Sequence, residues 1–305
     1  MKIDTLTEVS LNGLPQWVYI RSQNRENPIL LFLHGGPGFP GIGIAQSYQS
    51  ELEQKFTVVQ WDQRGAGKSY SLDIPPETMN INQFISDLHE LVLYLNNTIN
   101  KQKIYLAGHS WGAMLGILAV KQYPELFEYF IGIGQTVSVG LTSEARLLFL
   151  IQEAQKRNDA EGLQILENAR GNGFGALFQA EYDYAVKYGG AFYGSSDTNR
   201  LGEIFFIQNT LYTDSEKQSV PQGMQFSGIL WNDIFTVNLM EAVTHVAIPV
   251  LFISGKHDML SPVSVVTKYY ETLKAPSKTI LYFDQSAHFP FLEETEHFCD
   301  VINGL

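Results

Sequence analysis

Residues 108–112 read Gly-His-Ser-Trp-Gly, which is the pattern G-x-S-x-G. An apolar run, 104–107, precedes the pattern, and a longer apolar run, 113–120, follows it. The first run has the length of a buried strand and the second that of a helix. Between a strand and a helix, this pattern forms a sharp turn that presents the serine hydroxyl. We therefore predict that Ser110 is a nucleophile; without the flanking runs, the pattern would equally fit an ordinary turn.

A serine hydroxyl becomes nucleophilic when a base accepts its proton and a carboxylate orients that base. After a serine on such a strand-turn-helix, the acid and then the base follow along the chain. Asp258 lies shortly after the apolar run 248–253, and His288 lies shortly after the last such run, 278–283. Parallel sheets hold their sites beyond the carboxyl ends of the strands, so both residues are suitably placed. We predict a catalytic triad of Ser110, Asp258 and His288.

Other acids and histidines lie close to these positions in the sequence. Asp284 is a second candidate for the acid, although it would share a loop with the base. His109 flanks the serine and is expected to point away from it, and His257 is expected to be a loop residue. No group of His, Asp and Glu residues has the spacing of a metal site, so we expect no metal.

The negative charge that develops on a substrate oxygen requires hydrogen-bond donors around it. One donor is expected to be the backbone N–H of Trp111, directly after the nucleophile. A second is expected in residues 34–38, His-Gly-Gly-Pro-Gly, which follow the apolar run 28–33. Glycines let the backbone approach a substrate closely. We therefore predict an oxyanion hole formed by the N–H groups of Gly36 and Trp111.

Residues 64–69, Arg-Gly-Ala-Gly-Lys-Ser, imitate the end of a phosphate-binding loop. The first glycine of that motif would fall on Asp62, however, so the match fails. We expect no nucleotide and no other cofactor. Asp62 and Arg64 are instead expected to form a local ion pair that braces neighbouring loops.

Strand-like and helical segments alternate along the two ends of the chain. Residues up to about 21 fit a hairpin, residues 82–95 have helical spacing, and further apolar runs fit buried strands: 28–33, 56–61, 104–107, 129–134, 248–253 and 278–283. This alternation is typical of an α/β protein with a mostly parallel central sheet flanked by helices. It breaks within residues 136–243, where the sequence fits helices and loops. We predict an α/β core, residues 1–135 and 244–305, that an inserted helical cap, residues 136–243, interrupts.

The composition of the chain limits its partners. It has 305 residues and a net charge of −12, which argues against a nucleic-acid partner. Its single cysteine, Cys299, excludes an internal disulfide. The first residues lack an export signal, and no apolar run is long enough to cross a bilayer. We expect a cytoplasmic protein that does not enter a membrane.

Three stretches together resemble the proline iminopeptidase family of serine aminopeptidases, within the α/β-hydrolase superfamily. They are residues 34–38 (HGGPG), 61–69 (WDQRGAGKS) and 108–112 (GHSWG). The resemblance covers the predicted core and implies an α/β-hydrolase fold with a helical cap over the site. It also implies the triad Ser110, Asp258 and His288. The implied reaction removes an N-terminal residue, proline or similar, from a short peptide through an acyl-enzyme.

In that family, cap glutamates are expected to hold the free amino group of the substrate. Residues 136–243 carry 13 Asp or Glu against 7 Lys or Arg. A buried carboxylate binds an ammonium, and an aromatic face adds cation–π attraction. The predicted substrate-binding residues are therefore Glu181, Glu203 and Trp231. The same triad also suits a carboxylesterase, thioesterase or lactonase acting on a small molecule, and the fold also serves non-catalytic ligand-binding proteins.

Overall fold

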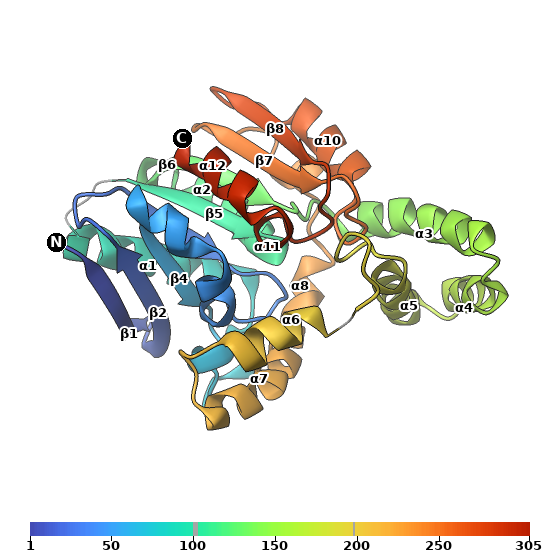
Figure 1. Ribbon diagram of the computed structural model, residues 1–305, viewed down its shortest axis with the longest axis horizontal. Helices are drawn as coiled ribbons and strands as arrows, with labels where there is room; N and C mark the ends of the chain where they lie inside the picture. The colour runs from blue at the N-terminus through green and yellow to red at the C-terminus, as the bar shows by residue number, and fades with distance from the viewer. Residues whose placement is uncertain (100–102, 198) are drawn as a thin grey trace.

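The structure is a computed structural model that describes residues 1–99, 103–197 and 199–305. Eight strands of the described residues form one sheet in the order β1-β2-β4-β3-β5-β6-β7-β8 (Figure 1). The strands are β1 (Ile3–Leu11), β2 (Leu14–Ser22), β3 (Ile29–Leu33), β4 (Thr57–Asp62), β5 (Ile104–His109), β6 (Phe127–Ile133), β7 (Val250–Gly255) and β8 (Lys278–Phe283). β2 runs antiparallel to β1 and β4, and the remaining neighbours pair in parallel. The expected mostly parallel sheet is confirmed.

Helices cover both faces of this sheet, as its apolar strands require. The core helices are α1 (Ile81–Ile99), α2 (Trp111–Gln122), α10 (Val263–Thr272), α11 (Pro290–Glu293) and α12 (Thr295–Asn303). Along β3, Leu31 and Leu33 belong to the apolar cluster that also contains side chains of α1, α2 and α10, while Leu30 and Phe32 belong to the cluster that contains side chains of α12. This alternation follows from the two-residue period of a strand.

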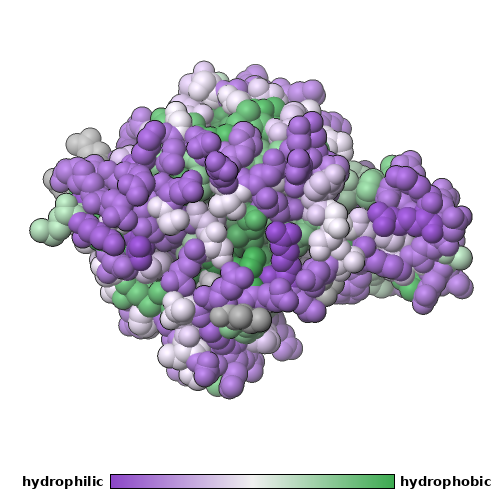
Figure 2. All heavy atoms as spheres, viewed as in Figure 1, coloured by the Kyte–Doolittle hydropathy of each residue, from purple (hydrophilic) through white to green (hydrophobic). Residues whose placement is uncertain are grey.

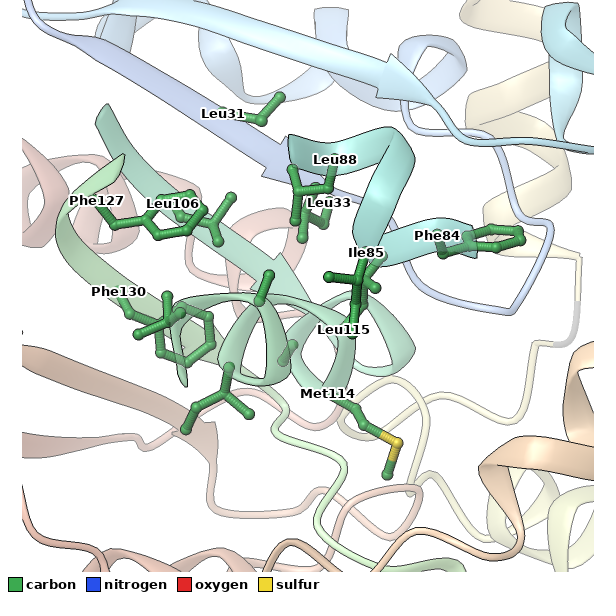
Figure 3. Close-up of a cluster of buried hydrophobic side chains, with 14 of the residues drawn as sticks. Leu31, Leu33, Phe84, Ile85, Leu88, Leu106, Met114, Leu115, Phe127 and Phe130 are labelled. Atoms are coloured by element: carbon green, nitrogen blue, oxygen red, sulfur yellow. The ribbon is translucent and has the colours of Figure 1, made fainter. Parts of the chain in front are cut away.

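A cluster of buried apolar side chains lies under the nucleophile pattern. Figure 3 shows side chains from the sheet meeting side chains from α1 and α2, among them Leu33, Leu106, Phe130, Leu88 and Leu115. α2 is apolar on nearly all sides and is buried along most of its length. A helix of this kind is held by the core around it. The first residues of α2 are therefore fixed relative to the ends of β3 and β5.

A helical region is inserted between β6 and β7. It contains α3 (Val139–Lys156), α4 (Ala160–Gly171), α5 (Phe174–Lys187), α6 (Arg200–Glu203), α7 (Asp214–Ser227), α8 (Trp231–Ile234) and α9 (Leu239–Ala242). α3, α4 and α5 extend away from the sheet, at the right of Figure 1, and share a small apolar cluster of their own. The exact limits of the cap, residues 136–243, stay a prediction.

The segment around α7 is fastened to the core by polar contacts. Lys68 Nζ lies 2.6 Å from Glu216 on α7, and the Tyr212 hydroxyl donates to the buried carboxylate of Asp62. The expected ion pair between Asp62 and Arg64 is wrong. Arg64 instead donates to both carboxylate oxygens of Asp87 on α1, at 2.8 and 2.9 Å. Asp62 accepts hydrogen bonds from the backbone N–H groups of Ile42 and Lys68 and from Tyr212, and it makes no ion pair with Arg64.

Among the described residues, no helix combines the length and the apolar character needed to span a membrane.

Candidate active site

The nucleophile candidate Ser110 lies in the turn between β5 and α2. Its backbone angles are φ 55° and ψ −117°, a combination that costs energy in any residue with a side chain. The two glycines of the pattern make the turn possible by close packing. A Cβ on Gly108 would lie 2.3 Å from the carbonyl oxygen of Gly112, and one on Gly112 would lie 2.2 Å from that of Leu33. The strand-turn-helix expected from the sequence is present.

The base and acid candidates contact each other at the ends of β7 and β8. His288 Nδ1 lies 2.8 Å from Asp258 Oδ2, and both side chains are buried. The other carboxylate oxygen of Asp258 accepts the backbone N–H groups of Leu260 and Ser261, at 2.8 and 2.7 Å. These three hydrogen bonds fix the position of the carboxylate. Such an acid holds the histidine in the tautomer whose Nε2 accepts a proton.

The alternative acid, Asp284, lies elsewhere. Its side chain is 71% exposed and pairs with Lys256 at 2.6 Å. Exposed pairs of this kind contribute little and do not orient a buried imidazole. His257, in the loop after β7, has its Nε2 3.2 Å from the carbonyl oxygen of Asp284, in the loop after β8. Of the two acids considered, only Asp258 therefore lies in contact with His288.

A glycine at the end of β6 leaves space for this pair. Gly134 has φ +52°, and a Cβ there would lie 3.0 Å from His288 Nδ1 and 3.3 Å from Asp258 Oδ2. A side chain would press on the hydrogen bond between them and would also strain the backbone. The sequence analysis had assigned no role to this position.

Gln63, which the sequence analysis missed, links Trp111 to His34, two residues before Gly36. Its side-chain amide donates to the carbonyl oxygen of His34 at 3.0 Å, and its amide oxygen accepts the indole N–H of Trp111 at 3.0 Å. Its backbone N–H donates to His34 Nε2, also at 3.0 Å. Trp111 is the first residue of α2, where backbone N–H groups have no partner within the helix. Gln63 thus fixes the strand end that carries Gly36 relative to the start of α2.

His34 stays neutral within this arrangement. Its Nδ1 lies 2.9 Å from the carbonyl oxygen of Gly35, while its Nε2 accepts from Gln63, so only one ring nitrogen carries a proton. Burial lowers the pKa of His34 to about 4. A second proton would remove the acceptor that the Gln63 N–H requires.

A cavity of about 440 Å³ lies between the sheet and the inserted helices. Ser110, His288 and Gly36 line it, together with Pro37 and the apolar side chains of the loop after β3. Figure 2 shows that apolar residues visible on this face gather in a hollow near the middle of the molecule, whereas the projecting part is mostly hydrophilic. A cavity of this size admits a small molecule or a short peptide.

Comparisons with known proteins agree with this geometry. A family model described as alpha/beta hydrolase fold matches residues 28–295. The probable aminopeptidase YbaC of Bacillus subtilis (strain 168) is 35% identical over 309 residues, which cover 99% of this chain and 96% of that protein. The chain belongs to the alpha/beta hydrolase fold family.

More distant relatives of this hydrolase are consistent with that placement. A proline iminopeptidase of Clostridium botulinum is 26% identical over 278 residues, covering 90% of this chain and 88% of that protein. The crystal structure of proline iminopeptidase from Mycobacterium smegmatis has a TM-score of 0.70 at 20% sequence identity, with 98% of this chain and 97% of that chain covered. At such low identity, the structural likeness concerns the fold alone.

His109 of the hydrolase is a buried residue of the cavity wall, and the expectation that it points away from Ser110 stays a prediction. Its ring centroid lies 4.6 Å from that of His288, and its Nε2 lies 2.8 Å from the His288 carbonyl oxygen. Since a carbonyl only accepts, Nε2 carries the proton. Burial lowers the pKa of His109 well below its ordinary value, so the ring is neutral. His109 holds the backbone of His288 in place.

The predicted substrate-binding residues are dispersed in the hydrolase. Trp231 lines the cavity. Glu203 is exposed on α6 and is not among the residues that line it. Glu181 is fully buried on α5, 3.9 Å from Arg146. Arg146 lines the cavity and Glu181 does not. The structure thus places one of these three residues at the cavity surface.

Arg146 and Glu181 form a loosely paired couple in the cap. The closest approach of their charged atoms is 3.9 Å, and Glu181 accepts a hydrogen bond from Ser143 at 2.7 Å. Burial lowers the pKa of Arg146 and raises that of Glu181. The sequence analysis had not singled out Arg146; its spacing from Val139 and Thr142 on α3, which also line the cavity, was the available signal.

Proposed function

We propose that this hydrolase is a serine enzyme that removes the N-terminal residue from short peptides. Ser110 attacks the first peptide carbonyl, and His288 accepts its proton and then donates it to the leaving amine. Asp258 holds His288 in the required tautomer, and the N–H groups of Gly36 and Trp111 stabilise the oxyanion. Water then releases the acyl-enzyme. The observation that carries this proposal is that the strained Ser110 turn lines the same cavity as His288, whose Nδ1 is hydrogen-bonded to Asp258.

The choice of a peptide substrate is supported by the relatives. The protein with 35% identity is named a probable aminopeptidase, and it aligns along nearly the whole chain. Several relatives at lower identity are named proline iminopeptidases. The cavity volume of about 440 Å³ suits a peptide of a few residues.

A second candidate reaction, the hydrolysis of a small ester, thioester or lactone, is favoured by one observation. Among the described residues, no Asp or Glu side chain lines the cavity. An aminopeptidase commonly needs such a group to hold the ammonium of its substrate. Neither Glu181 nor Glu203 reaches the cavity surface in the structure.

The test compares a proline arylamide, an alanine arylamide, their N-acetyl derivatives and a short acyl aryl ester. Cleavage of the free arylamides, lost on acetylation, is the result that supports the aminopeptidase. Cleavage of the ester alone would transfer the proposal to the second reaction. Ser110→Ala is expected to lower kcat about 10⁶-fold on any of them, since loss of the nucleophile removes the acyl-enzyme route. Turnover by that variant at the wild-type rate would contradict both mechanisms.

A further inference from the structure

The cap contributes one permanently charged side chain to the cavity, and that charge is positive. Among the described residues that line the cavity, Arg146 is the only Lys or Arg, and no Asp or Glu is present. Arg146 lies on the face of α3 that also carries Val139 and Thr142. An ammonium group entering this part of the cavity would meet a guanidinium first.

The Arg146 guanidinium is held rigidly but is not fully hydrogen-bonded. Its side chain is 4% exposed. Nη2 donates to the carbonyl oxygen of Leu260 at 3.2 Å, and the guanidinium carbon lies 5.9 Å from the centre of the Phe178 ring. Nε has no hydrogen-bond partner in the described part of the chain. A buried N–H donor without a partner is unfavourable, and a ligand group that reaches the guanidinium from the cavity would relieve that cost.

Glu181 does not supply that missing partner. Its Oε2 is 3.9 Å from Arg146 Nη1, which is beyond hydrogen-bond distance, and it too has no partner among the described residues. Its Oε1 accepts from the Ser143 hydroxyl at 2.7 Å, so the hydrogen bond of this carboxylate goes to Ser143. Glu181 therefore lowers the cost of burying Arg146 without using its free donor.

We propose that Arg146 binds a carboxylate carried by the substrate, so that the hydrolase prefers small anionic substrates over neutral ones of the same shape. A guanidinium presents its donors in a planar fork that matches a carboxylate, and such charge-assisted bonds are among the strongest in proteins. For a peptide, this group is the C-terminal carboxylate of a dipeptide or an acidic side chain. The inference rests on the proposed hydrolytic site, but it holds for amide and ester substrates alike.

Arg146 is also connected to the catalytic acid, Asp258, by hydrogen bonds to one residue of the loop after β7. Leu260 accepts from Arg146 with its carbonyl oxygen, while its N–H donates to Asp258. A carboxylate bound at Arg146 is therefore positioned relative to the same short segment that fixes Asp258, and hence relative to His288. This geometry places the charge recognition near the reacting bond.

The test uses substrate pairs that differ in one negative charge. The first pair is the dipeptide Pro-Ala and its C-terminal amide; the second is the para-nitrophenyl monoester of glutaric acid and the para-nitrophenyl ester of pentanoic acid. Wild-type kcat/KM is expected to favour the anionic member of at least one pair about 10- to 100-fold. The double variant Arg146→Gln/Glu181→Gln removes both buried charges together, which avoids leaving one unpaired. Its ratio of anionic to neutral kcat/KM is expected to fall to about 1.

Two further variants separate recognition from general effects. Lys156→Gln removes a positive charge from the same helix at a side chain that is 77% exposed, and it should keep the wild-type ratio. Glu181→Gln alone should raise the ratio, because it removes the negative charge next to Arg146. Equal rates for both members of each pair in the wild type, or a preference that survives in the double variant, would overturn the proposal.

A binding measurement keeps this test independent of the reaction. Calorimetry with Ser110→Ala compares acetyl-alanine with acetyl-alanine amide, neither of which needs to be cleaved. Tighter binding of the carboxylate, lost when Arg146→Gln/Glu181→Gln is added, supports the subsite even where no peptide or ester is hydrolysed. Equal binding of the two compounds would remove the subsite while leaving the proposed serine chemistry unaffected.

Discussion

Two buried acids near the cavity differ in how many hydrogen bonds they accept. Asp258, in the core, accepts from His288 and from the backbone N–H groups of Leu260 and Ser261. Glu181, in the cap, accepts from Ser143, and its second oxygen has no partner among the described residues. Arg146, the cation beside Glu181, likewise has an Nε donor without a partner among the described residues.

Under the two proposals made above, the difference corresponds to two tasks. A catalytic group must already be in place when the substrate arrives, because reorganisation during the reaction raises the barrier. A recognition group gains affinity from bonds that form only with the ligand, so its own bonds are left incomplete. The core supplies rigid support through β7, β8 and their loops, whereas α3 and α5 belong to a region with its own small apolar cluster. Variants in the core should thus lower kcat, and variants in the cap should change substrate preference.

After the loss of the nucleophile in Ser110→Ala, the largest effect in the core is expected for Asp258→Asn. The amide cannot hold His288 in the tautomer that accepts the serine proton, so kcat should fall about 10⁴-fold with the fold intact. Steady-state kinetics on the best substrate measures this. Asp284→Asn is the matched control, because that acid is exposed and pairs with Lys256. Equal losses in the two variants would contradict the assignment of Asp258.

Stability should depend on pH through His34. Its pKa is about 4 in the folded protein and near 6.5 when unfolded, so the unfolded state binds more protons in between. The free energy of unfolding should therefore fall by about 3 kcal/mol as the pH falls from above 6.5 to below 4. The measurement is the free energy of unfolding by denaturant, as a function of pH, for the wild type and for His34→Gln. The difference between the two curves reports His34, because the contributions of other titrating groups largely cancel in it. Parallel curves would show that His34 is not held neutral.

A smaller effect on rate is expected for Gln63→Leu. This change removes the side-chain link between His34 and Trp111 but leaves both oxyanion N–H groups in the chain. Losing one oxyanion donor costs about 10²- to 10³-fold, so displacing the donors should cost about 10- to 100-fold in kcat. KM should change little. A loss confined to KM would place Gln63 in substrate binding instead.

The smallest expected effect lies in the cap. Trp231→Ala removes an aromatic wall of the cavity and should raise KM about tenfold, with kcat less affected. Glu203→Gln should change KM less than Trp231→Ala, because Glu203 is exposed and does not line the cavity. A larger effect of Glu203→Gln would mean that α6 moves toward the substrate, and it would weaken the contrast between a rigid core and an incomplete cap.

The local pattern of the sequence was enough to predict the sheet and the positions of Ser110, Asp258 and His288. Buried strands have continuous apolar runs, and parallel strands bring their carboxyl ends to one edge, so chain order and spacing fix which loops meet. A steric limit acts locally as well: Gly108 is required because a Cβ there would collide with the backbone of Gly112, four residues later.

The tertiary structure alone decided how side chains from distant segments pair. Arg64 binds Asp87 rather than Asp62, Gln63 connects His34 to Trp111, and His109 contacts the backbone of His288. In the cap, the tertiary structure places Arg146 at the cavity surface, whereas Glu181, 3.9 Å away from Arg146, does not line the cavity. Polar pairing over long separations depends on which helix faces meet and on the burial that results. An amphipathic pattern predicts that one face of a helix is buried, but it does not predict which element covers that face. The sign of the charge at the cavity wall could therefore not be predicted from the sequence.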